Sequence, residues 1–259
     1  MKVFDVVDQG HGPAVLFSHG TLLDRTMYTE QTAALADRYR TIAYTSRAGT
    51  SEYATDYDLD SLVSDCLEVA ARAGIDRFVL VGMSVGGFMA IELALKHPER
   101  LAGLVLMDTM ADAYTSEEKA RFADVFRPMK SEAPISESFA QTFVPIIFGP
   151  QAIANRPDLV DSWVRKWRTR PSRSVWGEYN SWIGKHERLS RLPEIEIPTL
   201  IVHGEDDNGI DIAAAERMHA RIPGSAFARI PGAGHLVTEE GPDAVTTALT
   251  TFLDALPRW

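Results

Sequence analysis

Short apolar runs alternate with segments of helical periodicity along most of the chain. Six runs rich in β-branched residues are predicted strands, and they cover residues 14–18, 41–44, 78–82, 101–108, 199–203 and 227–230. Several are apolar throughout, as strands are when helices cover both faces of a parallel sheet. Apolar residues recur at helical spacing over 59–70, 85–96 and 245–256, with Asp58 as the predicted N-cap of the first helix. The alternation predicts an α/β fold with a mostly parallel sheet and helices on both faces.

The alternation stops between about residues 111 and 192. This segment has no series of strands, and it contains six of the prolines and four of the five tryptophans. Because proline interrupts regular structure and the remaining pattern is helical, we predict a mostly helical cap over the sheet. The predicted domain organisation is a first core part at 1–110, a cap at 111–192 and a second core part at 193–259.

The 259 residues include 26 lysines and arginines against 36 aspartates and glutamates, which gives a formal net charge of −10. An acidic balance argues against a nucleic-acid partner, since phosphate binding needs a basic face. The charge is uneven, because the predicted cap carries +3 and the rest of the chain −13. Basic side chains in the cap could steer an anionic substrate, although a solvated face is the more common role of a charge run. They are Arg165, Lys166, Arg168, Arg170 and Arg173.

The single cysteine, Cys66, excludes an internal disulfide and a cysteine-based zinc site. It lies on the apolar stripe of the 59–70 helix, where core packing is its expected role. No apolar run approaches the roughly 20 residues that span a bilayer, and the first residues do not resemble a signal peptide. We expect a cytoplasmic protein without a membrane partner, and the sequence leaves open whether it forms a homo-oligomer.

A serine between glycines marks the junction of the 78–82 strand and the 85–96 helix, in the segment Gly82-Met83-Ser84-Val85-Gly86. In such a turn the serine backbone is strained, its hydroxyl projects from the sheet, and small residues two positions away let the turn close. Serine between glycines also occurs in plain turns, but the position between a strand and a helix strengthens the signal. Ser84 is therefore the predicted nucleophile.

A serine hydroxyl near neutral pH needs a base, and the base needs a group that orients it. Among the seven histidines we select His235, in a glycine-rich loop after the last predicted strand. The acidic loop after the 199–203 strand supplies the third member, for which we choose Asp207, with Asp206 as the alternative. Asp108, at the end of another strand, is a less favoured candidate because it also suits a structural hydrogen bond.

Acyl transfer also needs N–H donors for the oxyanion that develops on the carbonyl. One predicted donor is the Val85 amide, next to the nucleophile, and the other is the Thr21 amide, in the loop after the 14–18 strand. His19, in that same loop, is expected to pack or to form a hydrogen bond there. His203, at a strand end, fits a structural or a catalytic role.

These motifs resemble those of the α/β-hydrolase superfamily over nearly the whole chain. The run His19-Gly20-Thr21-Leu22-Leu23-Asp24 and the Gly-Met-Ser-Val-Gly-Gly turn are most similar to the branch of 3-oxoadipate enol-lactonases, esterases and cofactor-free haloperoxidases. The resemblance implies an eight-stranded sheet, a helical cap after the sixth strand, the triad Ser84, Asp207 and His235, and no metal or cofactor. It also favours Asp207 over Asp206, because the acid of the family is the last residue of Gly-x-x-Asp.

One loop departs from the family pattern. In the loop that follows the 41–44 strand, relatives typically have Asp-x-Arg-Gly-x-Gly-x-Ser. This chain has Thr45-Ser46-Arg47-Ala48-Gly49-Thr50-Ser51 there, without the aspartate. The loop borders the pocket entrance in relatives, so the resemblance is a weaker guide to the substrate than to the chemistry.

The predicted function is a serine hydrolase that cleaves a carboxylic ester or lactone of a small, largely apolar substrate through an acyl-enzyme. The same triad would serve C–C bond hydrolysis, acyl transfer or perhydrolysis, and a non-catalytic ligand receptor is an alternative of another class. Candidate substrate-binding residues lie near Ser84 or are cap aromatics, although core packing is the expected role of most cap aromatics. They are Leu22, Met83, Phe148, Trp163 and Trp182.

Overall fold

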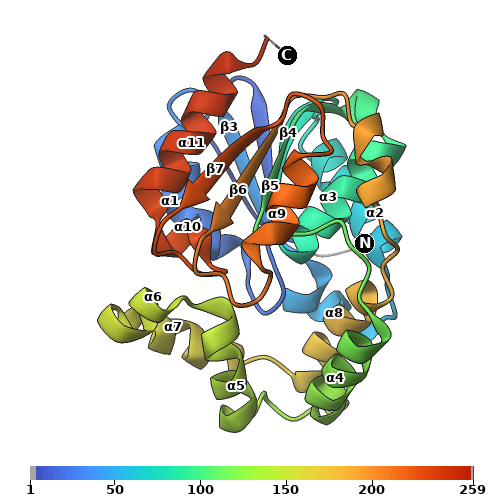
Figure 1. Ribbon diagram of the computed structural model, residues 1–259, viewed down its shortest axis with the longest axis vertical. Coiled ribbons are helices and arrows are strands. Elements are labelled where there is room, and N and C mark those ends of the chain that lie inside the picture. The colour runs from blue at the N-terminus through green and yellow to red at the C-terminus, as the bar shows by residue number, and fades with distance from the viewer. Residues whose placement is uncertain (1–3, 258) are drawn as a thin grey trace.

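A twisted sheet forms the centre of the computed structural model, which describes residues 4–257 and 259 (Figure 1). Its strands lie in the order β1-β3-β2-β4-β5-β6-β7, and β1 is antiparallel to β3 while the other neighbours are parallel. Every residue of β2, β4, β5 and β6 is buried, as expected for strands between two helical layers. The strands are β1 (Asp5–Gln9), β2 (Ala14–Ser18), β3 (Arg40–Thr45), β4 (Phe78–Met83), β5 (Leu101–Met107), β6 (Thr199–Gly204) and β7 (Ala226–Ile230).

The number of strands corrects one expectation. The described residues form seven strands rather than eight, and the cap helices follow the fifth strand rather than the sixth. A single antiparallel strand, β1, precedes β2, and its residues at the sheet edge are exposed or half-buried. Because its sequence Asp-Val-Val-Asp-Gln contains no apolar run, the hydrophobic pattern did not predict this strand.

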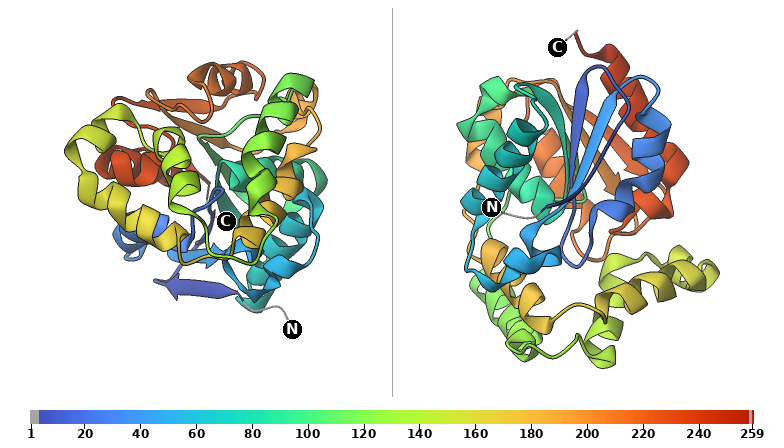
Figure 2. Two further views of the ribbon diagram at one scale, coloured as in Figure 1. Left: turned by 90° about the horizontal axis from the view of Figure 1, so that it is seen from below. Right: turned by 180° about the vertical axis from the view of Figure 1, so that it is seen from behind.

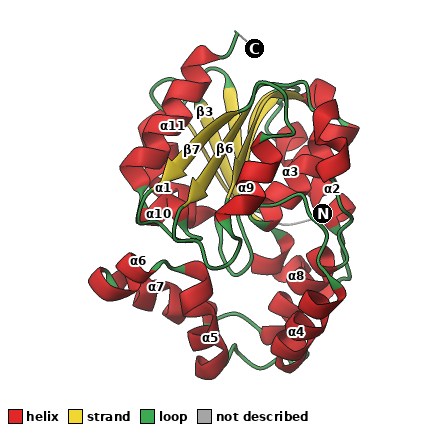
Figure 3. Ribbon diagram, in the orientation of Figure 1, coloured by secondary structure: helices red, strands yellow, loops and turns green. Residues whose placement is uncertain are grey.

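Helices cover both faces of the sheet, which confirms the predicted α/β layers. The helices α1 (Thr29–Leu35) and α11 (Pro242–Ala255) lie on one face, and α2 (Leu59–Arg72), α3 (Val85–Lys96) and α9 (Ile212–His219) lie on the other (Figures 1 and 3). The Asp58 carboxylate accepts the Ser61 N–H at 2.8 Å, so Asp58 caps α2 as predicted. The helix α3 is buried from Val85 through Ala94, and it begins directly after Ser84.

Among residues 4–257 and 259, no helix combines the length and the apolar character that crossing a membrane requires. The helices α2 and α11 have 14 residues each, against the roughly 20 that a bilayer demands.

Five helices between β5 and β6 extend across the carboxyl ends of the strands (Figure 2). Three of them share an aromatic core, in which Phe126 stacks on Tyr179 with ring centroids 4.5 Å apart and meets Phe143 and Trp182 edge-on. The loops at the carboxyl edge of the sheet therefore lie beneath the cap. The cap helices are α4 (Ser116–Phe126), α5 (Glu137–Ile147), α6 (Pro150–Asn155), α7 (Pro157–Trp167) and α8 (Ser172–Ile183).

The loop after β3, which departs from the family pattern, contains a buried ion pair. Arg47 donates two hydrogen bonds to the Asp65 carboxylate of α2, at 2.7 and 2.6 Å, and its guanidinium lies 5.1 Å from the centre of the Tyr57 ring. The two paired side chains are 9% and 1% exposed. The two parallel hydrogen bonds compensate both buried charges and fix the loop against the core.

We expect Asp65→Leu to lower the free energy of unfolding by about 3 kcal/mol, because it leaves the Arg47 charge buried without this partner. The double variant Arg47→Met, Asp65→Leu should recover most of the loss, since it removes both charges. Urea denaturation followed by circular dichroism measures the effect. Asp60→Ala, which removes a carboxylate exposed at the surface, serves as the control and should cost no more than about 1 kcal/mol. A loss that is equally small for Asp65→Leu would contradict the prediction.

Candidate active site

Ser84 lies in the tight connection between β4 and α3. Its backbone has φ 52° and ψ −115°, which is unfavourable for a residue with a side chain. The end of β5 holds this conformation, because the Ser84 N–H donates to the Met107 carbonyl at 3.0 Å and the Thr109 hydroxyl donates to the Ser84 carbonyl at 2.8 Å. This strained turn is the geometry in which a nucleophilic serine projects from a sheet.

Two glycines permit the close packing around this turn. A Cβ on Gly86 would lie 2.3 Å from the Ser18 carbonyl oxygen, and a Cβ on Gly20 would lie 2.5 Å from the Met83 sulfur and 3.0 Å from Ser84 Cβ. Side chains would not fit at these separations. The loop after β2 therefore lies directly against Ser84.

Asp207 and His235 meet at the same edge of the sheet, after β6 and β7. The His235 Nδ1 lies 2.8 Å from Asp207 Oδ2, and Asp207 Oδ1 accepts the N–H groups of Gly209 and Ile210 at 2.7 and 2.9 Å. These bonds orient the carboxylate toward Nδ1 of the ring, which leaves Nε2 available for proton transfer. Within the described residues the alternative acid, Asp206, has no hydrogen bond to His235.

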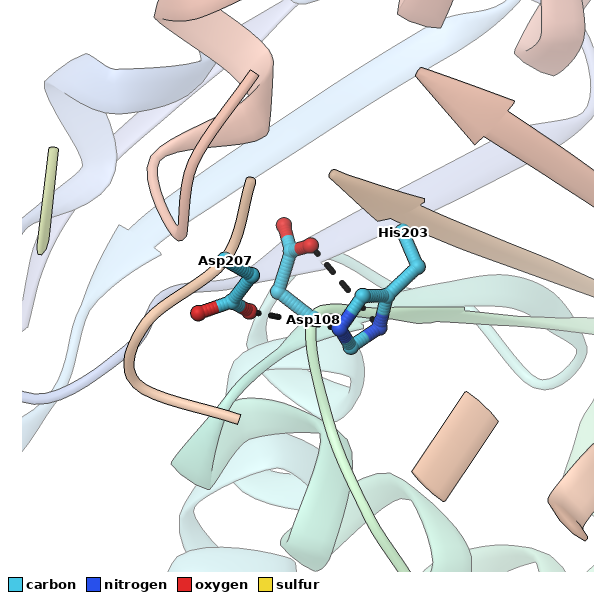
Figure 4. A group of neighbouring side chains, drawn as sticks. All are labelled: Asp108, His203 and Asp207. Carbon is cyan, nitrogen blue, oxygen red and sulfur yellow. Dashed lines mark ion pairs between the residues drawn. The ribbon is translucent and has the colours of Figure 1, made fainter. Parts of the chain in front are cut away.

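A second buried histidine, His203, lies beside Asp207 (Figure 4). His203 Nε2 lies 2.8 Å from the Ile210 carbonyl oxygen and 3.3 Å from Asp207 Oδ2, and its Nδ1 lies 3.9 Å from Asp108 Oδ1. Asp108 Oδ1 accepts the Gly204 N–H at 2.9 Å. Burial, and then the nearby charge of Asp207, raises the pKa of the Asp108 carboxyl well above its usual range. Asp108 thus makes a structural hydrogen bond, which is the alternative role that its sequence position suits, and this bond holds the end of β6.

Asp108, His203 and Asp207 each offer a potential ligand atom within 4.8 Å of the others, a spacing that a metal ion could bridge. All three side chains are buried. Asp108 Oδ1 and Asp207 Oδ1 already accept backbone N–H groups, and Asp207 Oδ2 lies 2.8 Å from His235 Nδ1. An ion that took Asp207 as a ligand would compete with His235 for the same carboxylate. We therefore interpret the cluster as the support of Asp207.

The Thr21 and Val85 amides lie on the two segments that meet at Ser84. In the part of the chain that the structure describes, neither N–H donates to another protein group. Val85 is the first residue of α3, and the first N–H groups of a helix have no partner within it and carry partial positive charge. The arrangement leaves two N–H donors beside Ser84 for a developing oxyanion.

His19 fixes the loop that carries Thr21. Its Nε2 accepts the Ser46 N–H at 2.8 Å, and its Nδ1 lies 2.8 Å from the Gly20 carbonyl oxygen. An acceptor at Nε2 requires the proton to be on Nδ1, which then donates to the Gly20 oxygen. Burial lowers the pKa of His19 from 6.5 to about 4. The neutral ring therefore keeps both hydrogen bonds at pH 7.

Glu240 fixes the loop that carries His235 and joins this loop to the cap. Its carboxylate accepts the N–H groups of Gly234 and Leu236, which flank His235, at 3.0 and 3.2 Å. It also accepts the N–H of Gly149, immediately before α6, at 2.9 Å. One half-buried carboxylate thus holds together the histidine loop and the start of a cap helix.

Ser84, His235 and Thr21 line one cavity of about 60 Å³ beneath the cap. None of the residues that line it is a lysine, arginine, aspartate or glutamate. The rest of the wall is apolar and largely aromatic, and it consists of Phe88, Tyr114, Phe122, Phe126, Phe143, Ile146, Ile147, Trp182, Gly209 and Ile210. The wall therefore suits a small uncharged group.

Of the five candidate substrate-binding residues, the structure brings Trp182 to this cavity. Met83 is buried beside Ser84, and Leu22 is buried in the loop after β2. Phe148 packs near the Trp167 ring, and the Trp163 indole donates to a glutamate after β7. These four side chains pack within the fold and do not line the cavity.

Most of the aromatic wall was not predicted from the sequence, although helical spacing indicates part of it. Phe88 lies four residues after Ser84 on α3, and Phe122 and Phe126 are four residues apart on α4, so each pair shares a helix face. Once Ser84 is identified, the first spacing indicates Phe88. The contribution of α4 depends on how the cap is placed, which no local spacing reveals.

The chain is similar to known proteins in both its sequence and its structure. A sequence model described as the alpha/beta hydrolase fold matches residues 13–242. The structure is similar to that of a thermophilic esterase from Thermogutta terrifontis, with a TM-score of 0.91, 29% identity, and coverage of 97% of this chain and 93% of that one. The sequence is 25% identical over 262 residues to a non-heme haloperoxidase from Rhodococcus erythropolis, covering 96% of this chain and 94% of that protein.

The chain is also similar to one segment of a much longer protein. It is 28% identical over 255 residues to the polyketide synthase ThaQ of Burkholderia thailandensis, and the match covers 96% of this chain and 12% of the synthase.

We expect the free energy of unfolding to fall as the pH is lowered from about 6.5 to about 4. In this window the unfolded chain binds a proton at His19, whereas the folded protein, in which the pKa of His19 is about 4, does not. A pKa shift of this size corresponds to a loss of about 3 kcal/mol in the free energy of unfolding across this pH range. Urea denaturation at pH 7, 5.5 and 4 measures it, with His19→Gln as the control that cannot titrate at this position. An equal loss in both proteins would contradict the assignment.

Proposed function

Because this chain belongs to the alpha/beta hydrolase family, as its motifs predicted, we propose that it is a serine hydrolase that cleaves carboxylic esters or lactones. The observation that carries this proposal is the 2.8 Å contact between His235 Nδ1 and Asp207 Oδ2, made at the cavity that Ser84 also lines. The esterase and haloperoxidase relatives, which belong to the branch that the motifs resemble, support the same chemistry.

In the proposed reaction, Ser84 Oγ attacks the carbonyl carbon of the substrate while His235 Nε2 takes the hydroxyl proton. Asp207 holds the Nδ1–H tautomer and stabilises the imidazolium that forms. The Thr21 and Val85 N–H groups bind the negatively charged oxygen of the tetrahedral intermediate. His235 then gives its proton to the leaving alkoxide, which departs as the alcohol. Water then attacks the carbonyl carbon of the acyl-enzyme while His235 takes a proton from it. When the second tetrahedral intermediate breaks down, His235 returns the proton to Ser84 Oγ and the carboxylic acid is released.

The cavity supports a short, uncharged acyl group as the preferred substrate. Its volume is about 60 Å³, and its wall is mainly aromatic. An anionic group at this wall would lose its hydration without gaining a cationic partner. A neutral acetyl to butyryl ester, or a small lactone, fits these conditions.

Perhydrolysis is the second candidate, and the haloperoxidase relative favours it. In that reaction hydrogen peroxide takes the place of water and attacks the acyl-enzyme, which releases a peroxy acid and restores the Ser84 hydroxyl. Both activities pass through the same acyl-enzyme, so an initial burst of released alcohol separates them from a non-catalytic receptor.

Ser84→Ala should lower kcat for p-nitrophenyl acetate by at least about 10⁴-fold, because the attacking group is lost. Asp207→Asn should cause a loss of similar order, since the amide no longer holds the required tautomer of His235. Steady-state release of p-nitrophenol measures both effects.

Asp206→Asn is the matched control, and it should keep kcat within about threefold of the original value because this carboxylate does not contact His235. A fluorophosphonate probe should label the original protein and leave Ser84→Ala unlabelled. Full activity of Ser84→Ala would refute the proposed nucleophile.

The ratio kcat/KM should be at least about tenfold higher for p-nitrophenyl butyrate than for the octanoate, because the cavity wall stops the longer chain. Trp182→Ala should shift the preference toward the octanoate by removing part of that wall. Trp176→Ala is the control, since this tryptophan belongs to the same helix but does not line the cavity. The same preference in both variants would contradict the role assigned to Trp182.

A further inference from the structure

A buried carboxylate of the cap contacts the loop that carries a predicted oxyanion donor. Glu178 lies on α8 and is 2% exposed. Its Oε2 accepts the Leu22 N–H at 3.0 Å, across 156 positions of sequence. Leu22 immediately follows Thr21, so this hydrogen bond joins the cap to the residue next to the predicted donor.

The backbone of Leu22 explains why this contact matters. Leu22 has φ 65°, and the N–H of Leu23 donates to the Gly20 carbonyl at 3.2 Å, so the loop is a turn with Leu22 at its third position. A positive φ at that position is typical of a type II turn, where glycine is the usual residue. A leucine relieves this strain when the peptide between it and Thr21 turns over. The bond to Glu178 opposes that rotation, because it holds the N–H of the same peptide.

The surroundings of Glu178 place it behind the predicted oxyanion donors. Glu178, His19 and Val85 border one small cavity of about 10 Å³. Arg170 lies 3.6 Å from Glu178 Oε2, and its guanidinium also donates to the Ala48 carbonyl. Burial raises the pKa of Glu178, while Arg170 and the Leu22 N–H lower it. The carboxylate thus has a cation and a backbone donor beside it.

We propose that Glu178 is a positioning residue. By holding the N–H of the Thr21–Leu22 peptide, it keeps the Gly20–Leu23 turn in the conformation in which the preceding peptide directs the Thr21 N–H toward the oxyanion of the substrate. This inference rests on the proposed function. It means that the hydrolytic site is complete only when α8 of the cap is seated on the loop after β2. The cap then contributes to the rate of the reaction as well as to the shape of the cavity.

The test replaces Glu178 with methionine, which is similar in size but is not a strong acceptor, and with glutamine, which keeps an acceptor oxygen. Glu178→Met should lower kcat for p-nitrophenyl acetate by about 10- to 100-fold, and KM should change by less than about threefold, because the oxyanion forms only during the reaction. Glu178→Gln should restore most of kcat.

Glu132→Met is the matched control. Glu132 is another cap carboxylate that contacts the core, through a 3.2 Å hydrogen bond from Tyr53, but it lies far in the chain from any predicted site residue and is exposed. This variant should leave both kcat and KM within about twofold of the original values.

Amide hydrogen exchange supplies a readout that does not require turnover. In Glu178→Met, peptides containing residues 20–24 should exchange faster, while the helices α4 to α8 should keep their protection. Three results would overturn the inference: an unchanged kcat in Glu178→Met, an equal loss in Glu178→Gln, or a loss of protection throughout the cap. If the original protein hydrolyses no ester, the proposed function fails, and the exchange of residues 20–24 still decides whether Glu178 holds the loop.

Discussion

The site depends on one close approach of backbone to backbone, between the start of α3 and the end of β2. A Cβ on Gly86 would lie only 2.3 Å from the Ser18 carbonyl oxygen. This contact brings the strained Ser84 turn beside the loop that follows β2. The parallel sheet carries the loops after β6 and β7 to the same edge, and with them Asp207 and His235. Topology therefore assembles the groups, and local hydrogen bonds only have to orient each of them.

The cap also forms hydrogen bonds and an ion pair with the loops at this edge of the sheet, in addition to covering them. Glu240 joins the histidine loop to the start of α6, and Lys166 of α7 lies 3.1 Å from Asp24 in the loop after β2. Glu178 holds the neighbouring Leu22 amide. The side chains that make these contacts are far from each other in sequence, yet they fix the two loops that carry the proposed base and one of the oxyanion donors. A change in the position of the cap would therefore displace the loops that carry the proposed base and the proposed oxyanion donor.

The sequence predicted those features that local pattern determines. Buried strands have continuous apolar runs, so β2 was predicted at its observed bounds, whereas the polar edge strand β1 left no such signal. The order of motifs pointed to Ser84, Asp207 and His235, because each of these residues follows a predicted strand and can be recognised from its local sequence alone. The cavity wall was not predictable in the same way. It combines α3 with several cap helices, and aromatic residues such as Phe148, which pack inside the cap, look the same in sequence as Trp182, which lines the cavity.

The positive charge of the cap is a poor guide to the substrate, because most cations of its basic cluster are paired. Of the five basic residues of the cap cluster, four lie within ion-pair distance of a carboxylate, and the pairs are Lys166–Asp24, Arg168–Glu137, Arg170–Glu178 and Arg173–Glu132. These four cations therefore already have carboxylate partners when an anion approaches. Over longer distances the net charge of −10 disfavours the approach of anions. At short range the uncharged aromatic wall would strip their hydration without replacing it. Both effects act in the same direction, and they support the proposed preference for a small, neutral acyl group.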